Sequence, residues 1–229
     1  MESIGALKQP PPVSSDMFYA SIVLDVAGLL LALIIDLNFL LLVLVYIGVS
    51  KAYSWEKIRL KKYAITGWLT VILFQGGYTY MLVSMAASDN LSPNWFTEKN
   101  IAAMLFATLL IGAYYPLTQI YQHPEDGSRG DRTISIKLGI RGTFLFSAIF
   151  FMNSFAFAFY YFDRFDSPSD FLIMMLSLLP ATGYFLYWFL LTIRDAKNAD
   201  FEHSMRMTFI SSSCLLIAFS ILLIENQIN

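Results

Sequence analysis

Residues 100–139 read NIAAMLFATLLIGAYYPLTQIYQHPEDGSRGDRTISIKLG, an apolar run that ends in a dense cluster of polar and charged side chains. The apolar part is long enough to cross a bilayer as a helix. Gln119, Gln122 and Asp126 stand at i, i+3 and i+7 near its end, so they share one face if the helix persists that far. Unsatisfied amides and carboxylates in hydrocarbon are costly, so we expect this face to look into a protein cavity or a wet mouth.

The rest of the chain repeats the apolar half of this pattern. Of its 229 residues, 57% are hydrophobic and 14% charged, and the mean hydropathy of +0.58 excludes an ordinary soluble domain. We predict an all-α polytopic transmembrane bundle of about seven helices, because the apolar runs lack the alternation of barrel strands. The predicted spans are roughly 17–35, 37–50, 64–87, 100–122, 142–162, 170–193 and 205–225. Asp36–Asn38 separates the first two, and either a tight hairpin or one bent helix fits there.

Basic residues gather in the joints that lie on one side of an alternating seven-helix bundle. Those joints, with the segment before the first span, hold Lys8, Lys51, Lys57, Arg59, Lys61, Lys62, Arg129, Arg132, Lys137, Arg141, Arg194, Lys197 and Arg206. The opposite joints carry only Lys99 and Arg164. The positive-inside rule predicts that the basic side is cytoplasmic.

The joint Ser50–Tyr63, SKAYSWEKIRLKKY, holds five cations against one acid. One interpretation is an anchor on lipid phosphates, with Tyr53 as an interfacial aromatic. The other is a phosphate clamp, in which Arg59 offers a bidentate fork and Lys61 a point charge.

The joint after the fourth span mixes acids and bases. Glu125–Asp126 and Asp131 are interleaved with Arg129 and Arg132. A solvated loop with local ion pairs is one interpretation. The other is a Mg²⁺ site, since that ion is held by one or two carboxylates, substrate phosphates and water. Together the two joints predict a pocket that is charged at its mouth and apolar within, which suits an amphiphile with a phosphorylated head.

These residues resemble the UbiA-type superfamily of intramembrane aromatic prenyltransferases. The second aspartate-rich signature of that family, D-x-x-x-G-x-x-T followed by L-G, is matched by Asp126, Gly130, Thr133, Leu138 and Gly139. The form Q-x-x-Q-x-x-x-D resembles a bacterial branch, which places Gln119 and Gln122 at the positions of earlier aspartates. Tyr53–Lys62 is similar to the Tyr-Ser…Leu-Lys element of the family.

The chain departs from the family in its N-terminal part. Members have about nine helices and a first signature of the N-D-x-x-D-x-x-x-D kind, and no such run occurs here. Residues 1–16 resemble the segment that follows that signature. We therefore expect one transmembrane prenyltransferase-like domain over residues 1–229, equivalent to helices three to nine and N-terminally incomplete. A late start, a fragment and a real loss of half the metal site are all open.

The resemblance implies Mg²⁺-dependent transfer of a prenyl group from an allylic diphosphate to a lipophilic or aromatic acceptor, in a bacterial cytoplasmic membrane with the site loops facing the cytoplasm. It implies membrane lipids as partners and no nucleic acid, and leaves the oligomeric state unknown. Asp126 is the expected catalytic and metal-binding carboxylate, with Gln122 as a second metal ligand. The expected diphosphate-binding residues are Arg59, Lys61, Arg129 and Arg132, and the expected substrate-binding residues are Tyr53, Gln119, Gln122 and Asp131.

Two other classes stay open. A non-catalytic relative that binds prenyl lipids would explain the missing signature. A seven-helix transporter or receptor would place charges near the membrane midplane, where only Asp25 stands. Among single residues, Gln75 beside Gly76 and Gly77 either lines the acceptor pocket or packs against a helix, and we expect His123 to be a loop residue and not a base.

Overall fold

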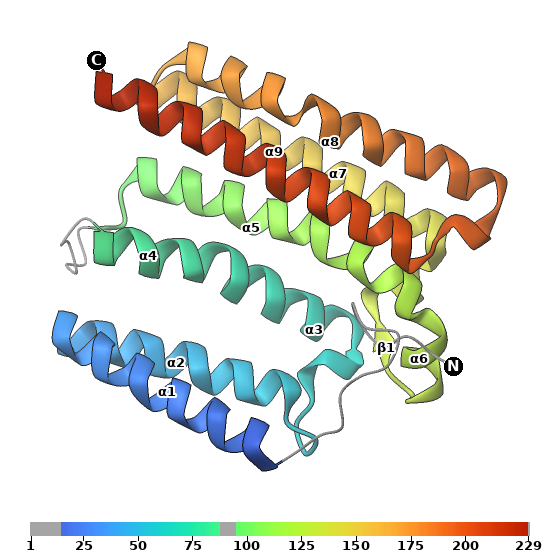
Figure 1. The fold of residues 1–229 in the computed structure, drawn as a ribbon, viewed down its shortest axis with the longest axis horizontal. Helices are drawn as coiled ribbons and strands as arrows, with labels where there is room; N and C mark the ends of the chain where they lie inside the picture. Colours follow the sequence, from blue (N-terminus) through green and yellow to red (C-terminus); the bar gives the residue numbers. More distant parts are fainter. Residues whose placement is uncertain (1–14, 88–94, 229) are drawn as a thin grey trace. The chain divides into compact units, whose positions relative to one another are not determined.

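The computed structural model describes residues 15–87 and 95–228 (Figure 1). The segment 1–14, which carries most of the expected family-like N-terminus, lies outside the described residues. The α-helices are α1 Ser15–Ile35, α2 Leu37–Ser54, α3 Ala64–Val71, α4 Thr79–Ala87, α5 Glu98–Gln119, α6 His123–Ser128, α7 Ile134–Phe165, α8 Pro168–Arg194 and α9 Phe201–Ile228. Shorter elements are the 3₁₀ turns η1 Leu60–Lys62, η4 Ile120–Gln122 and η5 Ala196–Asn198, the π-helix η2 Ile72–Tyr78, and the two-residue strand β1 Arg132–Thr133.

Seven helical segments in the described part of the chain are long and apolar enough to cross a membrane. They are Ser15–Ile35, Leu37–Ser54, Ala64–Ala87, Glu98–Ser128, Ile134–Phe165, Pro168–Arg194 and Phe201–Glu225. The prediction of an all-α, multi-pass bundle of about seven helices is confirmed. Two compact units make up the chain: a first unit of Met1–Arg59 with Met81–Trp95, and a second unit of Leu60–Tyr80 with Phe96–Asn229.

In the first unit, α1 and α2 form a helical hairpin. Asp36 interrupts the helix with extended backbone angles (φ −170°, ψ 154°), and its carboxylate accepts a hydrogen bond from the Asn38 N–H at 2.6 Å. An aspartate that caps the next helix in this way starts α2 afresh. Lys51 Nζ lies 2.6 Å from an Asp25 carboxylate oxygen and 3.2 Å from Ser21 Oγ. Of the two arrangements open from the sequence, the hairpin is therefore the one found, and Asp25 is ion-paired within it.

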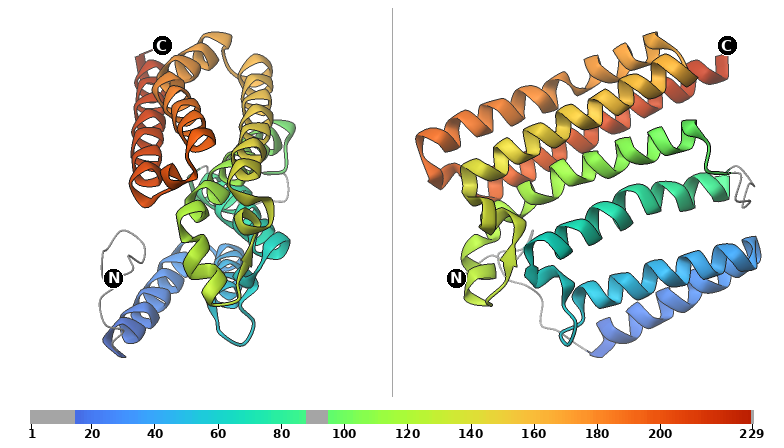
Figure 2. Two further views of the ribbon diagram at one scale, coloured as in Figure 1. Left: turned by 90° about the vertical axis from the view of Figure 1, so that its right-hand side faces the viewer. Right: turned by 180° about the vertical axis from the view of Figure 1, so that it is seen from behind.

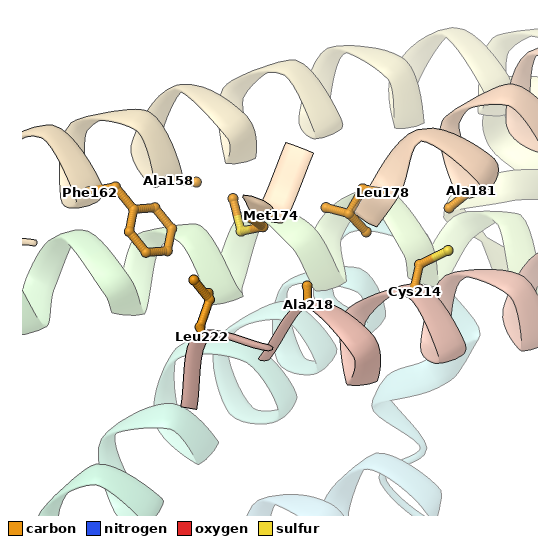
Figure 3. Packing of buried hydrophobic residues seen from close by; sticks show 8 residues of the cluster. All are labelled: Ala158, Phe162, Met174, Leu178, Ala181, Cys214, Ala218 and Leu222. Carbon is orange, nitrogen blue, oxygen red and sulfur yellow. The ribbon is translucent and has the colours of Figure 1, made fainter. Parts of the chain in front are cut away.

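The second unit packs α5 against α7, α7 against α8, and α8 against α9 (Figure 2). Figure 3 shows the buried cluster that joins α7, α8 and α9, made of Ala158, Phe162, Met174, Leu178, Ala181, Cys214, Ala218 and Leu222. Small residues in this set let the helices approach closely, which is how helices associate where lipid removes the hydrophobic driving force. The single cysteine, Cys214, is buried here as an apolar side chain.

The contact of α3 with α5 depends on a proline. Pro116 lies inside α5 and has no N–H, so the Gly112 carbonyl loses its usual intrahelical donor. The indole N–H of Trp68 donates to that carbonyl at 3.1 Å instead. The Trp68 ring also meets Phe146 and Phe150 of α7 edge to face, with centroid distances of 5.3 and 5.1 Å. One side chain thus ties α3, α5 and α7 together below the polar end of α5.

Candidate active site at the polar end of α5

The helix that carries the polar row does not continue as one α-helix. α5 ends at Gln119, a 3₁₀ turn covers Ile120–Gln122, and α6 begins at His123. Pro124 explains the break, because its ring conflicts with a carbonyl four residues earlier and it has no N–H to donate. The expected common face of Gln119, Gln122 and Asp126 depended on an unbroken helix, so that spacing argument does not apply here.

A tight turn after α6 places a second carboxylate beside the first. Gly130 has a left-handed φ of 71°, the Asp131 N–H donates to the Asp126 carbonyl at 2.9 Å, and the Gly130 N–H donates to Gly127 O at 3.1 Å. This is the hydrogen-bond pattern of a Schellman C-cap, which requires a residue that tolerates positive φ. Asp131 is buried, and its carboxylate interacts electrostatically with that of Asp126. The glycine four residues after the aspartate therefore has a defined structural role.

The threonine and the second glycine of the same pattern shape the start of α7. Thr133 Oγ1 caps the helix by accepting from the Ile136 N–H at 3.4 Å. Gly139 interrupts α7 with φ 67° and ψ 172°, a conformation that essentially only glycine adopts. Thr143 Oγ1 donates to the Gly139 carbonyl at 2.8 Å across this break. The D-x-x-x-G-x-x-T…G spacing thus encodes one turn, one cap and one helix break.

The end of the basic joint lies beside this acidic turn. Tyr63 bridges to Arg132 and Ala64 bridges to Thr133 in parallel, which aligns the chain after η1 with β1. Lys61 interacts electrostatically with the Asp126 carboxylate. One cation of the basic joint and two carboxylates of the acidic joint are thus brought together within the second unit.

Arg129 is already partly neutralised. Its guanidinium lies 2.7 Å from a Glu125 carboxylate oxygen, and the two side chains are 49% and 21% exposed. The pair spans one helical turn and is open to solvent, so it contributes little stability and can exchange partners. Arg132 is exposed on β1.

The two glutamines present carbonyl oxygens. Gln119 is buried, and its Oε1 has no hydrogen-bond partner in the described part of the chain. The Gln122 Nε2 donates to the Thr118 carbonyl at 3.2 Å and to the Tyr121 hydroxyl at 2.9 Å. A buried amide oxygen left without a donor is unusual, and a bound cation or ligand donor would satisfy it.

His123 has a place that the sequence did not reveal. Its Nε2 lies 2.7 Å from Ser135 Oγ, which lies 3.1 Å from Thr143 Oγ1. Ser135 and Thr143 are fully buried. His123 is therefore the first residue of α6 and not a loop residue, and this chain of hydrogen bonds attaches the start of α6 to α7. The hydroxyl residues Ser135 and Thr143 near the start of this helix were the available signal in the sequence.

Two of the predicted site residues belong to the first unit. Tyr53 is half-buried near the end of α2. Arg59 adopts a left-handed φ of 46°, and its N–H donates to the Trp55 carbonyl at 2.7 Å. Such a conformation is uncommon for a side chain of this size. The remaining predicted residues, namely Lys61, Gln119, Gln122, Asp126, Arg129, Asp131 and Arg132, belong to the second unit.

An apolar cavity of about 330 Å³ lies among α5, α7, α8 and α9 of the second unit. Tyr114, Phe151, Phe155, Phe185 and Leu215 are among its lining residues. The Tyr114 hydroxyl donates a hydrogen bond to the Met207 carbonyl at 3.2 Å, so the ring of Tyr114, and not its hydroxyl, lines the cavity. Tyr114 precedes Gln119 by five residues, which is about 7.5 Å along an α-helix. A hydrocarbon chain suits such a wall.

The oxygen ligands of the second unit fit Mg²⁺. Asp126 and Asp131 supply two neighbouring carboxylates, and Gln119 supplies a buried carbonyl oxygen without a donor. The described residues contain no group of three or more His, Cys, Asp or Glu side chains that could hold a metal ion. Mg²⁺ commonly binds through one or two carboxylates and completes its shell with substrate phosphates and water, so a pair of aspartates is a sufficient protein contribution.

Comparison with known proteins identifies a family to which this chain is similar. A sequence model described as the UbiA prenyltransferase family matches residues 13–213, a range that includes both joints and every predicted site residue. Searches of curated proteins and of solved structures gave no match.

Proposed function

Because the chain belongs to the UbiA prenyltransferase family, we propose that it moves a prenyl group from an allylic diphosphate to a lipophilic or aromatic acceptor within the membrane. The observation that carries this proposal is the electrostatic interaction of the Asp126 carboxylate with both Lys61 and Asp131, beside the bridge of Tyr63 to Arg132. Opposite charges arranged in this way bind a diphosphate together with a divalent cation.

The residues of the second unit have separate roles in this proposal. Asp126 and Asp131 hold Mg²⁺, with the amide oxygens of Gln119 and Gln122 as further ligands or as acceptors for the head group. When bound, Mg²⁺ acts as a Lewis acid that neutralises charge on the departing diphosphate. Lys61 places a positive charge at the same end, where negative charge grows as the allylic carbon–oxygen bond breaks.

The remaining cations complete the diphosphate site. Arg129 exchanges Glu125 for a diphosphate oxygen, and Arg132 adds positive charge at the same end of the second unit. The roles expected for Arg59 and Tyr53, which belong to the first unit, stay predictions. A guanidinium binds two phosphate oxygens at once, which fixes orientation as well as charge. The basic joints face the cytoplasm, where water-soluble diphosphates are supplied.

The apolar cavity takes the hydrocarbon part of a substrate. Burial of a chain contributes about 0.8 kcal/mol for each methylene, so a tail of a few isoprene units would contribute most of the binding free energy. Rings such as Phe151 and Phe185 also exclude water, which keeps an allylic cation from being hydrolysed.

A second function has one observation in its favour. The apolar cavity of the second unit suits a hydrocarbon chain whether or not a bond of the substrate is broken. A relative that binds prenyl lipids without turning them over needs the cavity and the cations, and does not need a complete metal site.

One experiment separates the two functions. The purified full-length protein in lipid nanodiscs is given radiolabelled prenyl diphosphates of several lengths, with a membrane lipid extract as the source of acceptor, in Mg²⁺ or in EDTA. An enzyme transfers label to an extractable lipid in Mg²⁺ alone, and Asp126→Asn lowers that rate at least about 100-fold, as expected for loss of a metal ligand. The matched control is Asp163→Asn, which leaves the rate unchanged. Asp163 is an exposed carboxylate near the C-terminal end of α7, whereas the acidic turn precedes the N-terminal end of that helix. Saturable binding of the prenyl diphosphate with no labelled product would favour the lipid-binding relative.

A further inference from the structure

The span Ala64–Ala87 contains a π-helix, η2, near its middle. Within it, Gly76 and Gly77 pack directly on α5. A Cβ on Gly76 would lie 2.7 Å from Thr108 Cα, and one on Gly77 would lie 2.6 Å from Thr108 Oγ1. The Thr79 hydroxyl donates to the Phe74 carbonyl at 2.7 Å, which supports the widened turn. Single π-helical turns occur often at functional sites, because they alter the direction of neighbouring side chains.

Gln75 lies on the side of its helix opposite an exposed apolar ridge. Ile65, Leu69 and Leu73, spaced at i, i+4 and i+8, are 54%, 40% and 52% exposed and form an apolar ridge on this helix. Gln75 follows Leu73 by two residues, which places it roughly 180–200° around the helix from that ridge. Gln75 is exposed and has no hydrogen-bond partner among the described residues.

Gln75 lies near the middle of the span Ala64–Ala87, where a side-chain amide without a hydrogen-bond partner raises the free energy of the folded protein. It follows Ala64 by eleven residues, about 16 Å along the helix at 1.5 Å per residue. Ala64 is at the level of the bridge to Thr133, beside the acidic turn. A polar side chain near the middle of a membrane span needs a partner, and such side chains commonly mark substrate paths.

We propose that the Gln75 side chain binds the acceptor, by a hydrogen bond to a hydroxyl, carbonyl or carboxyl group on the edge of an aromatic ring that is remote from the diphosphate. This inference rests on the proposed function. The tail of a prenyl donor has no polar atom at this depth, so the acceptor is the substrate that can use the amide. The distance from the acidic turn accommodates, in order, the metal-bound diphosphate, the reacting carbon and one ring system.

The variants that test this differ only in polarity. Gln75→Leu removes the amide at nearly constant volume, and Gln75→Asn keeps it on a shorter side chain. Thr70→Val is the matched control, since the Thr70 hydroxyl already donates its hydrogen to the Thr66 carbonyl of its own helix at 2.7 Å. Each full-length variant is purified into nanodiscs, and its thermal unfolding is recorded to establish that it is folded.

The readout is the saturation behaviour for each substrate in the labelled-transfer assay. For Gln75→Leu, the amount of acceptor extract that gives the half-maximal rate rises about tenfold, because the polar group of the bound acceptor loses its hydrogen-bond partner. The KM for the prenyl diphosphate changes less than about twofold. Gln75→Asn gives an intermediate shift for the acceptor, and Thr70→Val gives none.

Other outcomes overturn the inference in distinguishable ways. Equal shifts for both substrates, or no shift for the acceptor, show that Gln75 does not bind it. A Gln75→Leu protein that unfolds at lower temperature while Gln75→Asn binds acceptor normally assigns the amide to helix packing. Absence of any labelled product from the wild-type protein refutes the proposed function, and this inference with it.

Discussion

Replacing Gly130 by alanine tests whether the turn after α6 holds the two aspartates together. Gly130 has φ 71°, and nothing lies within 4 Å of the position that a Cβ would take. The substitution therefore introduces no clash, and its only effect is to force an L-residue into the left-handed region. That costs roughly 1–2 kcal/mol.

Gly127→Ala is the matched control. Gly127 lies three residues earlier, within α6, and a Cβ there also meets nothing within 4 Å. Its helical backbone suits alanine, so this change is neutral or stabilises the helix by up to about 1 kcal/mol. The two variants thus add the same methyl group at positions three residues apart and differ in the backbone conformation that must accommodate it.

The assay is the rate of labelled prenyl transfer as a function of Mg²⁺ concentration. Gly130→Ala disfavours the conformation that sets Asp131 beside Asp126 by 1–2 kcal/mol, which corresponds to a factor of about 5–30. We expect the half-saturating Mg²⁺ concentration to rise by a factor in that range, and Gly127→Ala to leave it within about twofold. Equal behaviour of the two variants would refute the argument that this turn sets the metal-binding geometry.

Two further predictions concern stability, measured by thermal unfolding in detergent. Trp68→Phe leaves the Gly112 carbonyl without a hydrogen-bond donor and destabilises the protein by about 1–3 kcal/mol. In a Pro116→Ala background the restored backbone N–H of residue 116 can donate to that carbonyl, so the same change costs less stability. An equal loss of stability in both backgrounds contradicts this account. Ser135→Ala breaks the hydrogen bonds of Ser135 with His123 and Thr143 and destabilises the protein by about 1 kcal/mol. Ser147→Ala removes a buried hydroxyl that has no partner in the described part of the chain, so it is neutral or stabilising. The reverse order of stabilities would count against a structural role for the hydrogen bonds of Ser135.

The number and positions of the membrane spans could be predicted because apolar length alone determines them. The connection between the first two spans could not, since Asp36 fits either a bend or a cap until its extended backbone and its bond to Asn38 are seen. Pro124 was visible in the sequence, and its position should have argued against an unbroken helical face from Gln119 to Asp126.

The features that the sequence missed depend on contacts between distant segments. The hydrogen bond from His123 to Ser135, the π-helix at Gly76 and Gly77, and the apolar cavity all arise when separate helices pack together. By contrast, the ion pair of Glu125 with Arg129 has the i, i+4 spacing from which a helix predicts such a contact.

Binding of Mn²⁺ in place of Mg²⁺, followed by electron paramagnetic resonance, tests the central claim that the acidic turn and Lys61 form one site for a metal-bound diphosphate. Purified protein is titrated with Mn²⁺ with and without inorganic diphosphate. The account predicts that diphosphate strengthens Mn²⁺ binding to the wild-type protein, that Asp126→Asn abolishes this binding, and that Lys61→Gln weakens the effect of diphosphate. Unchanged Mn²⁺ and diphosphate binding in Asp126→Asn would contradict it.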